Sequence, residues 1–321
     1  MNRPQPFHVH ESDEPLDIRK DNIFKAVFTR NTPESAGALS GLVSAFIGRD
    51  ITIVSIVANE PPPENIRDRQ ISYDINCRAE NGELINVEMS FNPNVFEPIR
   101  LEFHTAKLFV GQNIRGSTKN FDDLRQTYQI AILAQKRFFP DKVFFHTFEY
   151  YDPIHNISLN GRTRIITLEL TKLDEVIEKS TSEMSISERW AVFFEYLTDK
   201  SRRDKINEIL ENEEGIAMAG QVLMKVSRDE EERARILRDE KIELDYQSGM
   251  VTAQRIGFKE GREKGFEEGH KEGHEKGIEE GFEKGLEEIA RNAMAKGYPV
   301  DDIIEITGLD LEIIKKLSEE E

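Results

Sequence analysis

The chain has 321 residues and a net charge of −18, so it is long enough for about two domains. This charge excludes a general nucleic-acid coat, because neutralising phosphates requires clustered Lys and Arg. No apolar run approaches the roughly 18 residues that span a bilayer, and the first residues lack the apolar core of a signal peptide. We therefore expect a cytoplasmic protein without a membrane segment.

The charge is unevenly distributed along the chain. Residues 1–170 carry 19 Lys and Arg against 22 Asp and Glu, a net charge of −3, whereas residues 171–321 carry 24 against 39, a net charge of −15. Seven Lys and Arg fall between residues 91 and 137, so a local basic surface could hold a polyanion that the whole molecule repels. The single cysteine, Cys77, cannot form an internal disulfide, which fits a reducing compartment.

The first quarter of the chain predicts an arm, two helices and a strand. Residues 1–15 are polar and contain prolines, and we predict that they are disordered. Between residues 17 and 48 the apolar residues recur at the helical period, and Thr32 followed by Pro33 predicts the N-cap of a second helix. The β-branched run 50–58 predicts a buried strand.

A β-hairpin is predicted where two apolar-alternating runs, 71–77 and 84–90, flank an Asn-Gly pair. Each strand carries one acid, Asp74 or Glu88, among apolar residues, where a charge is costly without a partner. If both acids project to the same side of the sheet, they can hold one Mg²⁺, which needs few oxygen ligands and keeps its waters. On the residues alone, charges that keep an edge strand soluble are the stronger interpretation.

A helix is predicted to begin near Pro98. Its period separates an apolar face from a neighbouring cationic face, on which Arg100 and Lys107 are expected to contact phosphate. The apolar face contains Ile99, Phe103, Ala106, Val110 and Ile114, and the cationic face contains Arg100, His104 and Lys107. At the start of the first predicted helix, Asp21 is interpreted as an acid favoured by the helix dipole, with an outer-shell metal ligand as the alternative.

The middle of the chain predicts a mixed α/β core followed by helices. Residues 121–138 are predicted to form a helix, and residues 142–151 and 163–171 to form strands. After residue 175 only helices are expected. The helix from Ser187 to Leu197 is predicted to bury Trp190, and residues 201–250 are rich in charged pairs that favour a solvated helix.

Near the C-terminus, glycine recurs at every fourth position from Gly257 to Gly285, and each glycine precedes a large residue. Eight glycines at about 1 kcal/mol each relative to Ala disfavour a lone helix. Two interpretations stay open: close packing of two such helices in a homo-oligomer, or a charged linker. His270 and His274 are placed four residues apart by the repeat itself, so we do not predict a metal site there.

These patterns predict five regions. The last region contains three short helices with many acids, which favours contact with protein over contact with DNA. The regions are a disordered arm (1–15), an α/β domain (16–175), a helical extension (176–250), the glycine-repeat helix or linker (251–287) and a helical tail (288–321). Self-association is expected through residues 251–321.

Three stretches together resemble a known family. They are KDNIFKAVF at residues 20–28, the hairpin from YDI to VEMS at 73–90, and RLEFHTAKLFVGQ at 100–112. They are similar to the PD-(D/E)XK nuclease superfamily, in particular the Rpn family of recombination-promoting nucleases and transposases. The resemblance covers about residues 15–175.

The resemblance implies both a fold and an activity. The fold is a restriction-endonuclease-like mixed sheet flanked by helices, followed in this chain by an all-helical C-terminal region. The activity is cleavage of DNA by an endonuclease that depends on Mg²⁺ or Mn²⁺. By position, Asp74 matches the motif Asp and Glu88 the second motif acid, and both would hold the metal.

The third motif position departs from the family, which usually has Gln there, and from the wider superfamily, which has Lys. This sequence has Ser90, whose hydroxyl can orient water but carries no positive charge. Three outcomes follow: a weak site, a site completed by Lys107, or an inactive copy. The competing hypothesis is a non-catalytic protein that self-associates through the glycine repeat.

Overall fold

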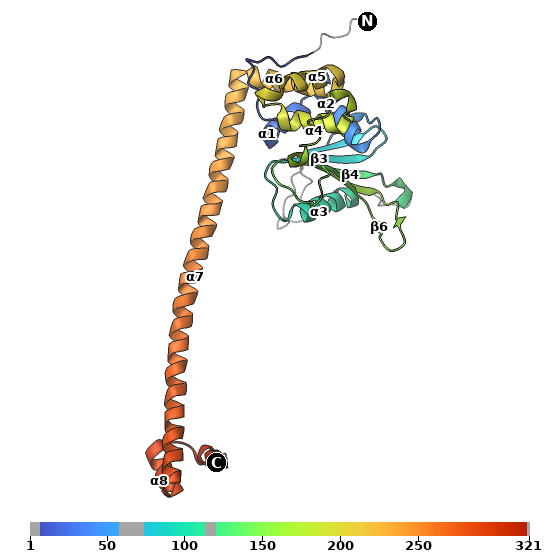
Figure 1. Cartoon of the computed structure of the whole chain (residues 1–321). Helices are drawn as coiled ribbons and strands as arrows, with labels where there is room; N and C mark the ends of the chain where they lie inside the picture. The colour runs from blue at the N-terminus through green and yellow to red at the C-terminus, as the bar shows by residue number, and fades with distance from the viewer. Residues whose placement is uncertain (1–6, 58–73, 113–119, 320–321) are drawn as a thin grey trace, which may run out of the picture. The chain divides into compact units, whose positions relative to one another are not determined.

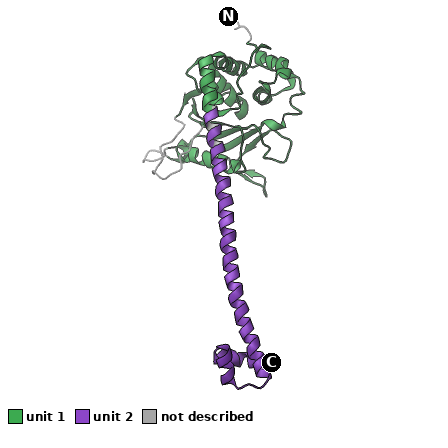
Figure 2. Ribbon diagram, turned by 90° about the vertical axis from the view of Figure 1, so that its left-hand side faces the viewer, with its two compact units in different colours: residues 1–240 green, residues 241–321 purple. Residues whose placement is uncertain are grey.

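The computed structural model describes residues 7–57, 74–112 and 120–319. It divides into two compact units, residues 1–240 and residues 241–321 (Figure 2). Within the described residues, no helix is both long and apolar enough to cross a membrane.

The first unit is built on a six-stranded mixed sheet in the order β1-β2-β3-β4-β8-β5. The first three of these strands pair antiparallel, β3, β4 and β8 run parallel, and β5 returns antiparallel to β8. The strands are β1 (Ile53–Ile56), β2 (Ile75–Ala79), β3 (Leu84–Ser90), β4 (Thr127–Leu133), β5 (Phe145–Phe148) and β8 (Thr163–Glu169). A separate small hairpin joins β6 (Tyr151–Asp152) to β7 (Ile157–Ser158).

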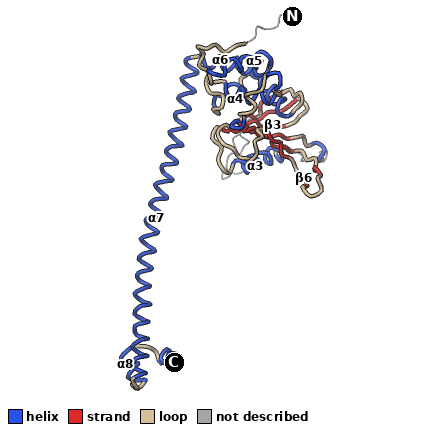
Figure 3. Tube along the Cα trace, viewed as in Figure 1, coloured by secondary structure: helices blue, strands red, loops and turns tan. Residues whose placement is uncertain are grey.

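Helices cover both faces of this sheet and make three layers (Figures 1 and 3). One face carries α3 (Glu97–Val110). The other face carries α1 (Asp21–Phe28), α2 (Pro33–Ile47), α4 (Ile186–Tyr196), α5 (Arg203–Asn212) and α6 (Glu214–Arg228). The largest hydrophobic cluster lies on this second face.

Several predicted local features are confirmed. The Thr32 hydroxyl accepts a hydrogen bond from the Ser35 N–H and caps α2, and Gly82 takes a φ of +84° in the turn of the hairpin. Trp190 is buried against Phe28 and Phe194, so it is a core residue. Residues 71–73 of the predicted first hairpin strand lie outside the described residues, and β2 begins at Ile75.

The helix predicted over residues 121–138 is wrong, because the middle of this segment is the strand β4. All seven residues of β4 are buried, and a strand covered on both faces reads as a continuous apolar run that periodicity alone cannot distinguish from a buried helix. The strand predicted over residues 50–58 exists as β1, but it is an edge strand and Val54 is exposed, so its predicted burial is wrong.

The orientation predicted for α3 is also wrong. Ile99, Phe103 and Val110 are exposed, with Phe103 at 56%, whereas His104 and Leu108 are buried against the sheet. Ile114 lies outside the described residues. The helix turned in this way because the adjoining sheet surface carries charged and amide side chains, so polar residues of α3 face inward.

Two other segments are more buried than their sequences predict. Residues 7–15 were predicted to be disordered, yet Val9 is buried and its N–H donates to Asn207 Oδ1 of α5; residues 1–6 lie outside the described residues. The helices α5 and α6, within the predicted solvated stretch, contribute buried residues to the main core. There α6 packs on α2 so closely that a Cβ on Gly41 would lie 3.0 Å from the Gly215 Cα.

In the second unit the chain is helical through the glycine repeat. The helix α7 (Glu230–Ala295) contains all eight repeat glycines, and a Cβ at any of them would have no other atom within 4 Å. Two short helices follow, α8 (Val300–Thr307) and α9 (Leu311–Glu319), and they bury a small cluster with the end of α7.

We predict that Gly41→Ala destabilises the first unit. The added methyl group meets the backbone of α6, and overpacking of this kind costs about 1–3 kcal/mol, which offsets the better helix propensity of Ala. Gly249→Ala is the matched control, because that position is open and Ala adds about 1 kcal/mol of helix propensity. Thermal unfolding followed by circular dichroism measures both changes. Equal melting temperatures for Gly41→Ala and wild type would contradict the close contact.

Candidate active site

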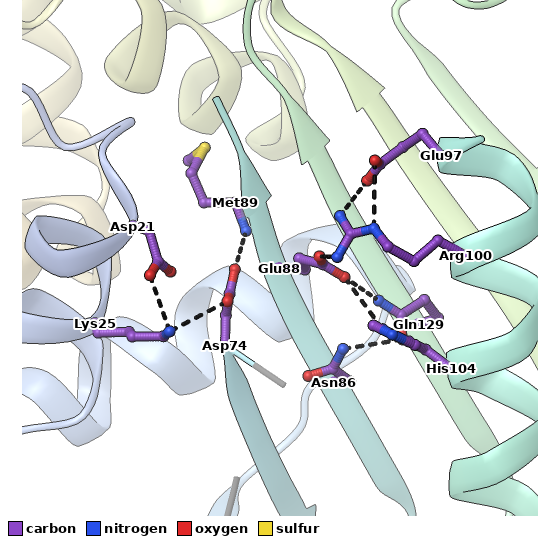
Figure 4. Close-up of polar contacts among 10 residues, drawn as sticks. All are labelled: Asp21, Lys25, Asp74, Asn86, Glu88, Met89, Glu97, Arg100, His104 and Gln129. Atoms are coloured by element: carbon purple, nitrogen blue, oxygen red, sulfur yellow. Dashed lines mark hydrogen bonds and ion pairs between the residues drawn. The ribbon is translucent and has the colours of Figure 1, made fainter. Parts of the chain in front are cut away.

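Two carboxylates meet where the β2–β3 hairpin reaches its open end. Ile75 pairs with Val87 in the antiparallel ladder, so Asp74, one residue earlier, lies beside Glu88 at the end of the ladder, with its carboxylate toward α1 and that of Glu88 toward α3 (Figure 4). Asp74 is largely buried and Glu88 is only 4% exposed. The hairpin register therefore brings together the two acids that the sequence singles out.

Asp74 is held by the backbone of β3 and by α1 (Figure 4). Its Oδ2 accepts a hydrogen bond from the Met89 N–H at 2.9 Å, and its Oδ1 lies 3.3 Å from Lys25 Nζ. Lys25 Nζ also donates to Asp21 Oδ2 at 3.0 Å. The Lys25 ammonium group therefore lies between the carboxyl groups of Asp21 and Asp74 and contacts both.

The pKa of Asp74 is raised from 3.8 to about 8. Burial is the main cause, and the negative charges of Asp21 and Glu88 add to it, while Lys25 and the Met89 N–H act in the opposite direction. Near neutral pH this carboxyl therefore holds a proton. A cation placed between Asp74 and Glu88 would reverse that preference.

Glu88 lies in a more cationic environment. Arg100 forms an ion pair with it, His104 Nδ1 lies 3.7 Å from Oε2, and Gln129 Nε2 donates to Oε2 at 3.2 Å. Gln129 is itself oriented by Asn86, whose Nδ2 donates to its Oε1 at 2.9 Å. Burial raises the pKa of Glu88, but the nearby His104 ring and the charge of Arg100 outweigh it, so the pKa is lowered.

Only part of the predicted cationic face of α3 contacts Glu88. Arg100 lies between Glu88 and Glu97, and it contacts both. His104 reaches Glu88 one turn later. Near the end of the helix, Gln112 donates to Thr127 Oγ1 at the start of β4, so the part of α3 that carries Lys107 runs away from Glu88. Arg100 and His104 thus lie at the site, and Lys107 lies farther along the helix.

Ser90 ends β3 and is partly exposed. Because side chains alternate along a strand, Ser90 shares a face with Glu88. Lys25, which sequence reasoning did not assign to the site, lies beside Asp74. Its signal was present, since Lys25 follows Asp21 by four residues, but that spacing is also the ordinary spacing of a helix-surface ion pair.

The donor set suits a hard divalent cation with many waters. Among the described residues, no group of three or more His, Cys, Asp or Glu side chains is arranged to hold a metal. Mg²⁺, however, is commonly bound through one or two carboxylates and keeps several waters. Asp74 and Glu88 supply two such groups, and the negative charges of Asp21 and Glu88, which add to the effect of burial on the pKa of Asp74, would be opposed by a cation.

Comparison with known protein families gives a match that covers this arrangement. The model of the PD-(D/E)XK nuclease family transposases matches residues 18–253, which is well over half of the chain. No curated protein and no solved structure gives a significant match. The matched region contains α1, the whole mixed sheet and α3, and therefore every residue of the site.

We predict that the metal-free protein loses stability as the pH rises from about 4 to about 8. The folded state binds the Asp74 proton more tightly than the unfolded state, so stability falls across the window between the two pKa values. Asp74→Asn removes this titration. In EDTA, the variant should exceed wild type in denaturation midpoint at about pH 8.5, and the difference should shrink towards pH 5. A difference independent of pH would show that Asp74 is ionised in the folded protein.

Proposed function

The chain belongs to the PD-(D/E)XK nuclease family transposases, and on this basis and the geometry of its site we propose that it is a metal-dependent DNA endonuclease. Its mixed six-stranded sheet with flanking helices is consistent with the restriction-endonuclease-like fold of the family. The observation that carries the proposal is the apposition of Asp74 and Glu88, two buried acids with a cation on each side.

Hydrolysis of a phosphodiester requires charge neutralisation at the phosphoryl group and an activated water. Mg²⁺ or Mn²⁺ held by Asp74 and Glu88 would supply both, by polarising phosphate oxygens and lowering the pKa of a bound water. The remaining residues position the substrate and water. Asp21, which shares Lys25 with Asp74, is proposed as an outer-shell group that fixes the ammonium.

Lys25 is proposed to provide the positive charge that Ser90 lacks. Its ammonium is 3.3 Å from Asp74 and comes from α1, so the charge reaches the site from a different element than the third motif position. A preorganised cation beside the phosphate stabilises the developing negative charge. Ser90, on the same face as Glu88, is left to orient water through its hydroxyl.

Arg100 is proposed to contact phosphate once a metal shares the charge of Glu88. Its guanidinium already pairs with both Glu88 and Glu97, so part of its bonding capacity is exchangeable. Glu97 then holds the guanidinium at the mouth of the site. Lys107 is proposed to contact a phosphate farther along the DNA strand.

The proposal is tested by nicking of supercoiled plasmid with Mg²⁺ or Mn²⁺. Asp74→Asn and Glu88→Gln should each lower the rate at least 100-fold, since even groups that only support metal ligands are worth 10–100-fold. Glu80→Gln is the matched control, an exposed acid in the turn of the same hairpin, and it should retain full activity. Nicking that persists equally in all three variants, or without metal, would remove the assigned site.

A pair of matched lysine variants locates the catalytic cation. Lys25→Met should lower the nicking rate about 10²–10³-fold, the usual loss for one preorganised electrostatic group. Lys107→Met should lower it less than tenfold, because that residue lies beyond His104 on α3. The reverse ranking would assign the catalytic charge to Lys107.

Self-association of the second unit is a second candidate function, favoured by the surface of α7. The repeat leaves Phe258, Phe266 and Phe282 exposed, and its glycines have open space beside them. Two such helices can approach closely along their glycines, and burial of the Phe side chains would stabilise the pair. This contact would make the protein a homo-oligomer whether or not it cleaves DNA.

Sedimentation equilibrium of the full chain tests this second candidate. The double variant Gly265→Leu, Gly269→Leu should be more helical yet monomeric, because Leu favours the helix and blocks close approach. Lys264→Leu adds the same side chain beside the glycines and should leave the oligomer intact. If the wild-type protein is monomeric at micromolar concentration, self-association through α7 is ruled out at that concentration.

A further inference from the structure

A cavity of about 220 Å³ lies beside the candidate active site, under the first turn of α3. Its floor is formed by the end of β4 and the middle of β8, and its walls are largely aromatic, with Phe138, Phe139 and Phe148 among them. Phe148 is itself exposed, so the cavity opens to solvent, and through Phe148 and Ile165 it continues into a larger groove of about 490 Å³ along α3.

The cavity contains one polar side chain from the sheet that lacks an internal partner. Thr167 of β8 is only 2% exposed, and its Oγ1 has no hydrogen-bond partner among the described residues. Buried hydroxyl groups are normally hydrogen-bonded, so an exception of this kind calls for an explanation. A ligand with an apolar face and a polar edge would satisfy it.

The size and walls of the cavity favour a flat ring. A cavity of about 150 Å³ is known to accommodate benzene, so this one has room for a single heterocycle. The Phe139 and Phe148 ring centroids are 5.1 Å apart, and His146 stacks on Phe148 at 5.9 Å. Aromatic side chains arranged in this way are the platforms on which nucleic-acid bases stack.

The register of the sheet connects the cavity to the metal site. Glu88 pairs with Ala131, and Ala131 pairs with Thr167, so these three residues form one row across parallel strands. Two strand spacings of about 4.8 Å each therefore separate Glu88 from Thr167. Glu97, which lines the cavity, forms the ion pair with Arg100 that continues to Glu88.

We infer that this cavity binds an unstacked nucleobase of the DNA strand whose phosphate lies at Asp74 and Glu88. The inference rests on the proposed nuclease function and specifies its substrate further. Extracting a base from an intact duplex costs stacking and pairing energy, and least when the base is already unpaired. The preferred substrate is therefore DNA with an unpaired base beside the cleaved bond, such as a mismatch or a junction of single and double strands.

The test uses the full-length protein with ¹³C-labelled Thr, Ile and Leu methyl groups, in Ca²⁺. The probe is a single strand of eight deoxyadenosines, and its control is an abasic strand of the same length, which has the phosphates and sugars but no rings. The deoxyadenosine strand should shift the Thr167 and Ile165 methyl signals upfield by ring currents. The abasic strand should leave both signals in place.

Two Thr→Val variants test whether the Thr167 hydroxyl in the cavity takes part in binding the deoxyadenosine strand. Thr167→Val keeps the shape and removes the Oγ1 hydrogen bond, and it should weaken binding of the deoxyadenosine strand about tenfold. Thr147→Val is the matched control on the neighbouring strand β5. That residue is exposed and lies on the opposite face from His146, so its variant should bind like wild type.

Several results would overturn the inference: no binding, equal shifts with the abasic strand, or shifts that avoid Thr167 and Ile165. A capped Gly-Phe-Gly peptide that produces the same shifts at lower concentration would identify a peptide site instead. Plasmid nicking by the same protein, with Mg²⁺ or Mn²⁺ in place of Ca²⁺, separates the two claims. Nicking without the methyl shifts supports the nuclease assignment and rules out the base pocket. Methyl shifts that depend on Thr167, without nicking, support the base pocket and rule out the nuclease assignment.

Discussion

The structure depends on one electrostatic constraint, which is the placement of two buried carboxylates opposite each other at the open end of a hairpin. Neither Asp74 nor Glu88 could stay there without compensation, since an isolated buried charge is prohibitively costly. Lys25 and a retained proton compensate Asp74, whereas Arg100 and His104 compensate Glu88. The cations come from α1 and α3, which lie on opposite faces of the sheet, so the site joins the layers of the fold.

The same constraint explains why one side of the sheet is polar. Asn86 orients Gln129, Gln129 donates to Glu88, and the ion pairs continue through Arg100 to Glu97 at the edge of the aromatic cavity. A polar layer of this kind is stable only when its members satisfy one another. It also gives the proposed metal site and the proposed base pocket a common wall, so binding at one is expected to affect the position of Arg100 at the other.

Local signals predicted much of the fold. The Asn-Gly turn, the Thr32 cap and the helical face containing Trp190 each depend on neighbouring residues, and all are confirmed. Tertiary context decided the rest. The run TYQIAIL became a strand because both of its faces are covered, and α3 turned its predicted apolar face outward because Glu88 needed Arg100 and His104. The role of Lys25 could not be predicted from the sequence, because its contact with Asp74 joins residues 49 positions apart. No local sequence pattern indicates such a contact.

The central claim is that Asp74 and Glu88 together hold one divalent cation, and calorimetric titration with Mn²⁺ in buffers of different ionisation enthalpy tests it most directly. Because the raised pKa keeps Asp74 protonated near neutral pH, binding at pH 7 should release close to one proton in wild type. Asp74→Asn should abolish that release and weaken binding, and Glu88→Gln should weaken binding as well. Mn²⁺ binding of equal affinity in all three proteins, or no binding to wild type at millimolar Mn²⁺, would contradict the account.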